Sequence, residues 1–183
     1  DIGANIGYFT LMLAKLVGPT GKVFAFEPDP RNISLLRKNI EINNYQNIIV
    51  IPKAVSNINQ KCTLFTSQSS FGQNRIYEPK KTRNQEFIPI ESETIKLDDF
   101  FKNKDEMGNI AFVRIDVEGA EKFVLEGMKN VLRSSRDVNI FSEIDLARLD
   151  DAGSSYVEVV EFLNKNGFTM FLVDKKENRI IKI

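Results

Sequence analysis

The sequence predicts an α/β fold with an open, mainly parallel sheet. Strand-like and helix-like segments alternate over most of its 183 residues, and one strand candidate is apolar throughout, as in a parallel sheet covered on both faces. The chain also begins with a glycine-containing turn, Asp1-Ile2-Gly3-Ala4-Asn5-Ile6-Gly7, that leads into a helix. Ligands of such folds bind beyond the carboxyl ends of the strands, so the residues that end each strand are the functional candidates.

The first elements are a helix, a strand and a second helix. Apolar residues recur at helical spacing over residues 8–17, and Gly18 ends that pattern. A short apolar run at residues 22–26 predicts a strand. Asp29 is expected to cap the next helix, which begins at Pro30 and carries apolar residues along one face.

The later elements repeat this alternation. Residues 47–52 contain four consecutive apolar residues and predict a strand buried on both faces. Two strand and helix pairs follow, at residues 111–116 with 120–133 and at residues 138–143 with 156–166.

The ends of the last helix carry further signals. Ser155 and Glu158 are spaced as a capping box, which predicts the start of this helix. Residues 168–173 and 179–183 flank a turn-rich segment and predict a terminal antiparallel hairpin.

Residues 57–93 interrupt the alternation. They are rich in Ser, Gln, Asn and Lys, and only residues 62–66 indicate a strand. A long irregular excursion in a compact domain is usually functional or mobile, so Phe71-Gly72 could belong to a substrate lid.

Composition excludes several classes of function. The 25 basic residues balance the 25 acidic ones, which argues against a nucleic-acid-binding protein. The single Cys permits no intrachain disulfide, and no apolar stretch is long enough for a membrane span, so we expect a cytoplasmic protein. Without His, a general base must be a carboxylate, Lys or Tyr, and we expect no metal site.

The opening turn is the first candidate for ligand binding. A dinucleotide fingerprint that starts at Gly3 would need glycine at the positions of Asn5 and Tyr8, so a nicotinamide-dependent oxidoreductase is poorly supported. The spacing of Gly3 and Gly7 instead matches the acidic-x-Gly-x-x-x-Gly turn of S-adenosylmethionine-dependent methyltransferases. A plain glycine-rich connection between strand and helix is the structural alternative.

Two groups of acidic residues follow predicted strands. Glu27 could accept hydrogen bonds from both hydroxyls of a ribose, or it could be an exposed acid at a strand end. Asp116, Glu118 and Glu121 lie within six residues of one another, and their mutual repulsion would be relieved by a cationic ligand. Alternatively these acids lie at a helix N-terminus, where negative charge interacts favourably with the helix dipole. This interpretation is the better one for Glu121, whereas Asp116 is the better functional candidate.

Together these segments resemble the FkbM-type family of S-adenosylmethionine-dependent methyltransferases. The resemblance is carried by residues 1–8, 24–28, 97–100 and 115–121, of which Asp116-Val117-Glu118-Gly119-Ala120-Glu121 is the most specific. It implies a three-layer, Rossmann-like class I methyltransferase fold with seven strands. It also implies O-methylation of a hydroxyl on a sugar or polyketide-like metabolite, with S-adenosylmethionine as the cofactor and a small molecule as the acceptor.

The resemblance also implies roles for particular residues. The methionine portion of the cofactor would lie near Asp1, Gly3 and Asp116, the ribose at Glu27, and the adenine near residues 54–56, where we name Ala54 and Val55. Asn5 of the opening turn is a further cofactor-binding candidate. The family's first strand should precede Asp1. We therefore expect residues 1–183 to form a single domain that is incomplete at its N-terminus.

Two residues are candidates for the base that deprotonates the acceptor hydroxyl. Glu143 ends a predicted strand, and Glu118 lies in the acidic turn. The alternative for Glu143 is a structural ion pair with Arg114, a basic residue in an otherwise apolar strand. A non-catalytic domain that binds the cofactor or a partner protein is the remaining alternative for the whole chain.

Overall fold

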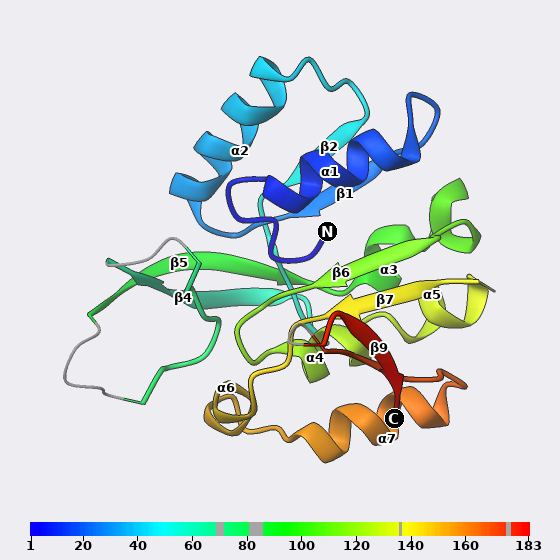
Figure 1. Cartoon of the computed structure of the whole chain (residues 1–183). Helices are drawn as coiled ribbons and strands as arrows, with labels where there is room; N and C mark the ends of the chain where they lie inside the picture. Colours follow the sequence, from blue (N-terminus) through cyan, green and yellow to red (C-terminus); the bar gives the residue numbers. More distant parts are fainter. Residues whose placement is uncertain (69–71, 81–85, 136, 175–176) are drawn as a thin grey trace.

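The centre of the fold is a parallel sheet (Figure 1). The computed structural model describes residues 1–68, 72–80, 86–135, 137–174 and 177–183. Strand β1 pairs with β2 and strand β6 with β7, and all of them are parallel. Their bounds are β1 Val23–Phe26, β2 Ile48–Ile51, β6 Phe112–Ile115 and β7 Asn139–Ser142.

Ile2 joins the two strand pairs into one sheet. It forms parallel bridges to Phe26 of β1 and to Ile115 of β6. Its N–H donates to the Arg114 carbonyl at 2.9 Å, and its own carbonyl accepts the Asp116 N–H at 3.0 Å. The start of the opening turn therefore lies between the central strands, beside their carboxyl ends. Whether a strand precedes it stays a prediction.

The predicted helices lie on both sides of this sheet. In Figure 1, α1 and α2 accompany β1 and β2, whereas α4 and α7 lie beyond β6 and β7. The cap at Asp29 is confirmed, because its carboxylate accepts the N–H of Arg31. The capping box of Ser155 and Glu158 is confirmed as well. The helix bounds are α1 Tyr8–Val17, α2 Pro30–Ile42 and α7 Tyr156–Lys165.

Two expectations about the sheet and its helices were wrong. Strand β2 is not buried on both faces: Ile49 is 42% exposed, and within the described residues β2 pairs only with β1, at the sheet edge. The helix expected at residues 120–133 is two helices, α4 Glu121–Glu126 and α5 Lys129–Ser134.

Gly127 and Asp98 lie at the break between α4 and α5. A Cβ at Gly127 would lie 2.1 Å from the Ser56 carbonyl oxygen, so only glycine fits there. The Gly127 carbonyl accepts the N–H of Asp98 at 2.9 Å in place of a helical hydrogen bond. The Asp98 carboxylate then accepts the N–H groups of Asn130 and Val131 at 2.9 and 3.0 Å and restarts the helix. Asp98 belongs to α3, Leu97–Phe101, an element that the pattern did not predict.

The excursion is more regular than we expected. Strand β4, Gln60–Ser67, extends the predicted segment and pairs antiparallel with β5, Phe87–Ile95. Strand β5 pairs on its other side with the two-residue β3, Ala54–Val55. The sequence missed β5 because its partner lies some twenty residues earlier, beyond the reach of local patterns. The Phe71 end of the proposed lid lies outside the described residues.

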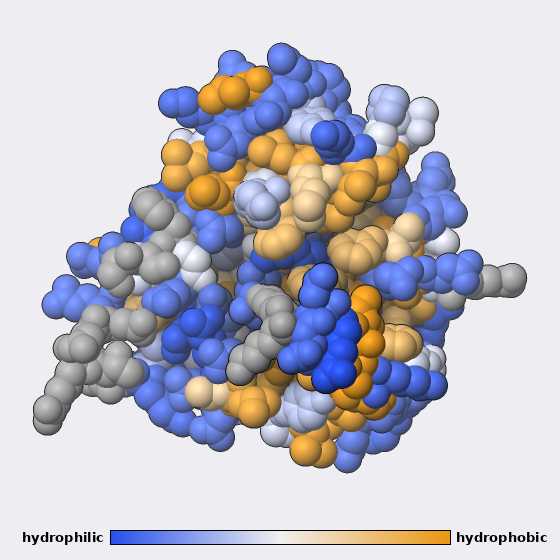
Figure 2. Space-filling model, in the orientation of Figure 1, coloured by the Kyte–Doolittle hydropathy of each residue, from blue (hydrophilic) through white to orange (hydrophobic). Residues whose placement is uncertain are grey.

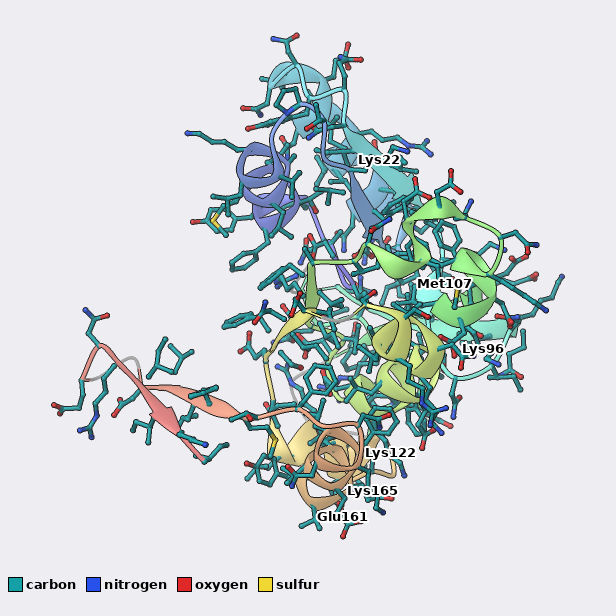
Figure 3. All side chains as sticks on the ribbon, turned by 90° about the vertical axis from the view of Figure 1, so that its right-hand side faces the viewer. Lys22, Lys96, Met107, Lys122, Glu161 and Lys165 are labelled. Carbon is teal, nitrogen blue, oxygen red and sulfur yellow. The ribbon has the colours of Figure 1, made fainter. Side chains whose placement is uncertain are left out.

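The terminal hairpin is confirmed and stands apart from the body. Its strands are β8 Phe171–Asp174 and β9 Arg179–Lys182, joined antiparallel. Figure 3 shows the hairpin projecting away from α7, where Lys165 and Glu161 are labelled. Two short unpredicted helices precede it along the chain, η1 Asp105–Gly108 and α6 Leu146–Asp151.

Apolar side chains fill the space between the sheet and the helices. Further apolar side chains are exposed on one face of α1. The main core includes Ile2, Ile115, Val124 and Met128, each at most 2% exposed. Figure 2 shows hydrophobic side chains gathered over α1, where Tyr8, Met12 and Leu16 are exposed. None of the described helices is long and apolar enough to cross a membrane.

Candidate functional site

A pocket opens at the carboxyl ends of β1 and β6, on the side of the opening turn. The centre of a water molecule could occupy about 60 Å³ of this pocket, and the empty space of the hollow, open solvent included, is about 570 Å³. The lining residues come from three strand ends and from the excursion: Ile2, Gly3, Asn5, Phe26, Glu27, Pro28, Asn32, Ala54, Val55, Leu64, Gly72, Asn74, Ile76, Asp116, Val117, Glu118 and Ala120.

The glycines of the opening turn allow close packing as well as a turn. Gly3 has a φ of +82°, and a Cβ there would lie 1.9 Å from the Asp116 carbonyl oxygen. A Cβ at Gly7 would lie 2.5 Å from a methyl of Leu36 on α2. Both positions therefore require glycine, since the turn is wedged between the end of β6 and α2.

Glu27 is buried at the floor of the pocket, so the alternative of an exposed strand-end acid is wrong. It is 4% exposed. Its carboxylate accepts the N–H of Asn5 at 2.8 Å, the N–H of Asp29 at 2.9 Å and the Asn32 amide at 3.4 Å. Burial raises the pKa of Glu27 to about 7, although these hydrogen bonds oppose the shift.

Asp29 links α2 to the excursion beside Glu27. Its carboxylate pairs with Arg31 at 2.8 Å and accepts the Asn74 amide at 2.8 Å. Burial would raise the pKa of Asp29, but its hydrogen bonds with Arg31 and Asn74 hold it below the usual value. Asn32 and Asn74 also line the pocket, and neither was predicted from the sequence. A polar residue on the otherwise apolar face of α2 was the available signal for Asn32.

Arg114 organises the opposite end of the pocket. Its guanidinium donates to Asp1 Oδ1 at 3.0 Å, to the Gly3 carbonyl at 3.1 Å and to Asp116 Oδ2 at 2.5 Å. It also lies 4.2 Å from the ring centre of Phe9. Since Arg114 is 8% exposed, these acids neutralise a buried charge.

The alternative for Glu143, a structural ion pair with Arg114, is not formed as a direct contact, because Arg114 pairs with Asp1 and Asp116. Glu143 acts on Arg114 only through charge attraction. No hydrogen bond or ion pair reaches the Glu143 carboxylate within the part of the chain that the structure describes. Glu143 is exposed and follows β7, and the parallel register of Ile115 with Ser142 places it next to Asp116. It lies outside the pocket lining, at the rim of the same sheet edge.

The acidic turn after β6 has an unusual backbone and internal support. Glu118 has a φ of +60° and Gly119 a φ of +106°. The Glu121 carboxylate accepts the N–H groups of Val117 and Gly119 at 3.3 and 3.2 Å. Glu121 begins α4, which confirms the prediction of an acid at a helix N-terminus, and its side chain is buried at 2% exposure. Burial raises its pKa against these hydrogen bonds.

Glu118 points to the pocket but is already neutralised. Its carboxylate forms an ion pair with Arg148 of α6, and its side chain is 12% exposed. The two candidate bases thus differ: Glu118 is paired and nearly buried, whereas Glu143 is unpaired in the described structure and open to solvent.

The remaining predicted residues give the pocket an apolar wall. Ala54 and Val55 of β3 are 6% and 2% exposed, and Leu64 and Ile76 of the excursion line the same hollow. The structure thus brings together Gly3, Asn5, Glu27, Ala54, Val55, Asp116 and Glu118. Asp1 contacts this set through Arg114. No group of three or more potential metal ligands occurs among the described residues.

The chain is similar in sequence to known methyltransferases. The chain is 26% identical over 142 residues to Methyltransferase 1 of Beauveria bassiana, covering 70% of this chain and 57% of that protein. It is 28% identical over 147 residues to 2-O-methyltransferase NoeI of Sinorhizobium fredii, covering 74% of this chain and 59% of that protein. The chain thus spans little more than half the length of these curated relatives.

A solved structure and a family match complete the comparison. The crystal structure of methyltransferase FkbM from Methylobacillus flagellatus superposes with a TM-score of 0.54 at 18% identity, covering 93% of this chain and 38% of that one. This likeness shows a shared α/β fold. Residues 1–170 match the methyltransferase FkbM domain. The chain therefore belongs to the FkbM methyltransferase domain family.

Proposed function

We propose that this domain transfers a methyl group from S-adenosylmethionine to a hydroxyl of a small molecule such as a sugar or a polyketide-like metabolite. The observation that carries the proposal is the buried carboxylate of Glu27, which faces a pocket with an apolar wall at one side and Asp116 at the other. Membership of the FkbM family and the printed name of the 2-O-methyltransferase relative support it.

The residues of the pocket fit the parts of this cofactor. Glu27 accepts Asn5 on Oε2 and both Asp29 and Asn32 on Oε1, so one acceptor position of Oε2 stays open for a ribose hydroxyl. The second hydroxyl would replace the long contact with Asn32, which measures 3.4 Å. Ala54 and Val55 offer a flat apolar surface for the adenine. Asp116 and Asp1 provide negative charge for the ammonium of the methionine portion, with Arg114 holding both in place.

The chain contributes chiefly position and charge. When bound, the cofactor supplies an electrophilic methyl group on a sulfonium. Holding the acceptor oxygen about 3 Å from that methyl, in line with the sulfur, could supply roughly 7 to 11 kcal/mol of the barrier. The protein's remaining task is to receive the proton of the hydroxyl.

Glu143 is the better of the two candidate bases. It lies beside Asp116 on the sheet edge and is exposed to solvent. Its carboxylate forms no direct ion pair among the described residues, although it lies close enough to Arg114 for charge attraction. The ion pair with Arg148 stabilises the anionic form of Glu118 and so makes it a weaker proton acceptor. Proton transfer to Glu143 would occur late, as the oxygen gains positive character.

Calorimetric titration followed by a transfer assay tests the proposal. We expect binding of S-adenosylmethionine and S-adenosylhomocysteine and none of NAD. Labelled S-adenosylmethionine should then methylate at least one member of a panel of hydroxyl-bearing sugars and polyketides. Binding of NAD in place of the sulfur nucleotides would favour an oxidoreductase. Cofactor binding without transfer to any acceptor would favour a non-catalytic binding domain.

A further inference from the structure

We propose that Tyr77 of the excursion is a positioning residue that holds the acidic turn at residues 116–119, and with it the methionine end of the pocket. The inference rests on the proposed function, because it assigns that end to the amino-acid portion of the cofactor. It makes recognition of this portion depend on a segment far away in sequence.

The contact is direct and specific. The Tyr77 hydroxyl donates to the Glu118 carbonyl oxygen at 2.5 Å and lies 3.3 Å from the Arg148 carbonyl oxygen. A Cβ at Gly119 would lie 2.8 Å from the same hydroxyl and 2.3 Å from the Arg148 carbonyl oxygen. Tyr77 and α6 therefore press directly on the backbone of the turn.

The turn needs such external support. Glu118 is a non-glycine residue at positive φ, which the backbone alone does not favour. The hydrogen bond that closes the turn, from the Ala120 N–H to the Val117 carbonyl, is long at 3.4 Å. Glu121 holds the N–H groups of the turn from the inside, and Tyr77 holds a carbonyl from the other side.

Tyr77 is itself fixed by its neighbours in the chain. The backbone of Arg75 forms two hydrogen bonds with Phe65 of β4, at 2.8 and 3.0 Å. The Asn74 amide bonds to Asp29, beside the Glu27 end of the pocket. Lys80 pairs with Asp150 and Asp151 of α6, each at 2.9 Å. Residues 74–80 thus span the pocket from one end to the other.

The chemistry of the phenol fits a fixed donor rather than a catalytic base. Burial raises the pKa of Tyr77 to about 12, so the hydroxyl keeps its proton across the physiological range. Its hydrogen bonds go to two backbone carbonyls, which only accept.

A pair of ligands separates positioning from general packing. S-adenosylhomocysteine carries the amino-acid portion, and 5′-methylthioadenosine lacks it. We expect Tyr77→Phe to weaken binding of S-adenosylhomocysteine about tenfold, the effect of losing one hydrogen bond, and to leave binding of methylthioadenosine unchanged. The matched control is Tyr156→Phe on α7, whose hydroxyl makes no hydrogen bond within the described residues; it should change neither affinity.

Either of two calorimetric results would overturn the inference. One is an unchanged affinity for S-adenosylhomocysteine in Tyr77→Phe. The other is an equal loss for both ligands, which would mean that Tyr77 shapes the whole pocket. If the unaltered protein binds neither ligand, the cofactor assignment fails, and the positioning role is then decided by the measurement below.

Amide hydrogen exchange tests the turn without any ligand. The Glu121 carboxylate accepts hydrogen bonds from the N–H groups of Val117 and Gly119. Tyr77→Phe should accelerate hydrogen exchange at these two amides, while the amides of β6 keep their protection. Unchanged exchange at these two amides would show that the hydroxyl does not hold the turn. Faster exchange throughout β6 would indicate general destabilisation and would equally contradict a positioning role.

Discussion

The two ends of the pocket are built in different ways. At one end, Glu27, Asp29 and Asn32 lie within six residues of one another, on the end of β1 and the first turn of α2. At the other end the contacts join five separate parts of the chain: the opening turn, the end of β6, α6, the residue after β7 and Tyr77.

The two ends of the pocket also differ in the groups that stabilise their buried carboxylates. Burial raises the pKa of Glu27 to about 7, since it is surrounded by hydrogen-bond donors and no cation lies within bonding distance among the described residues. Asp1, Asp116 and Glu118 are each paired with an arginine. The charge of Glu27 can therefore change with pH near neutrality, whereas the acids at the opposite end of the pocket are held by ion pairs.

The largest expected effect distinguishes Glu143 from Glu118. Glu143→Gln should reduce kcat by about 10² to 10⁴, the usual contribution of a positioned base, without changing the affinity for S-adenosylhomocysteine. Glu118→Gln should reduce kcat less, because Arg148 already neutralises this carboxylate. The measurement is the rate of methyl transfer to an acceptor found in the panel. A greater loss in Glu118→Gln would reverse the assignment of the base.

The next largest effect tests the end of the pocket that contains Glu27. Glu27→Ala should weaken binding of S-adenosylhomocysteine by roughly 30-fold or more, because two hydrogen bonds to a charged group are lost. Calorimetry provides the measurement. Glu41→Ala, which removes an exposed acid of α2, is the control and should leave affinity unchanged. Equal affinities in all three proteins would show that Glu27 does not hold the ribose.

A third change tests the end built from distant segments. Arg114→Met should lower the free energy of unfolding by about 3 kcal/mol, because it leaves the buried Asp1 carboxylate without its cation. Thermal unfolding should show a midpoint lower by roughly 6 to 12 °C. The exposed Arg37→Met on α2 is the control. Similar midpoints for both variants would mean that the ion pairs do not stabilise this end.

The smallest expected effect is a pH dependence specific to Glu27. Its pKa rises from 4.5 to about 7 in the folded protein, so folding favours the protonated form. Stability without ligand should therefore be highest below the unfolded pKa and fall as pH rises through about 7. Ribose hydroxyls favour the ionised form, so cofactor affinity should follow the opposite trend and weaken below that pH.

This pH dependence can be measured by unfolding and by calorimetry on the same samples. Between about pH 5.5 and about pH 8.5, affinity should change by at most tenfold per pH unit. Glu27→Gln should remove most of both trends. If the trends persist in that variant, another titrating group is responsible.

Local patterns were sufficient for much of the fold. Helices α1, α2 and α7 follow from apolar spacing, and the caps of α2 and α7 follow from Asp29, Ser155 and Glu158, since these signals lie within a few residues. Local patterns did not predict the secondary structure that depends on contacts between residues far apart in sequence. Asp98 forms hydrogen bonds with the backbone groups of Gly127 and Val131 and so interrupts a predicted helix. The unpredicted strand β5 pairs with β4 on one side and β3 on the other.

The same distinction applies to the pocket. The sequence by itself determined the chemistry of the strand ends: a neutral chain without His, with acids after β1, β6 and β7 and glycines where the opening turn is tight. Only the tertiary structure decided the partners of those acids. It paired Arg114 with Asp1 and Asp116 rather than Glu143, because the opening turn lies between β1 and β6 and brings Asp1 to the guanidinium.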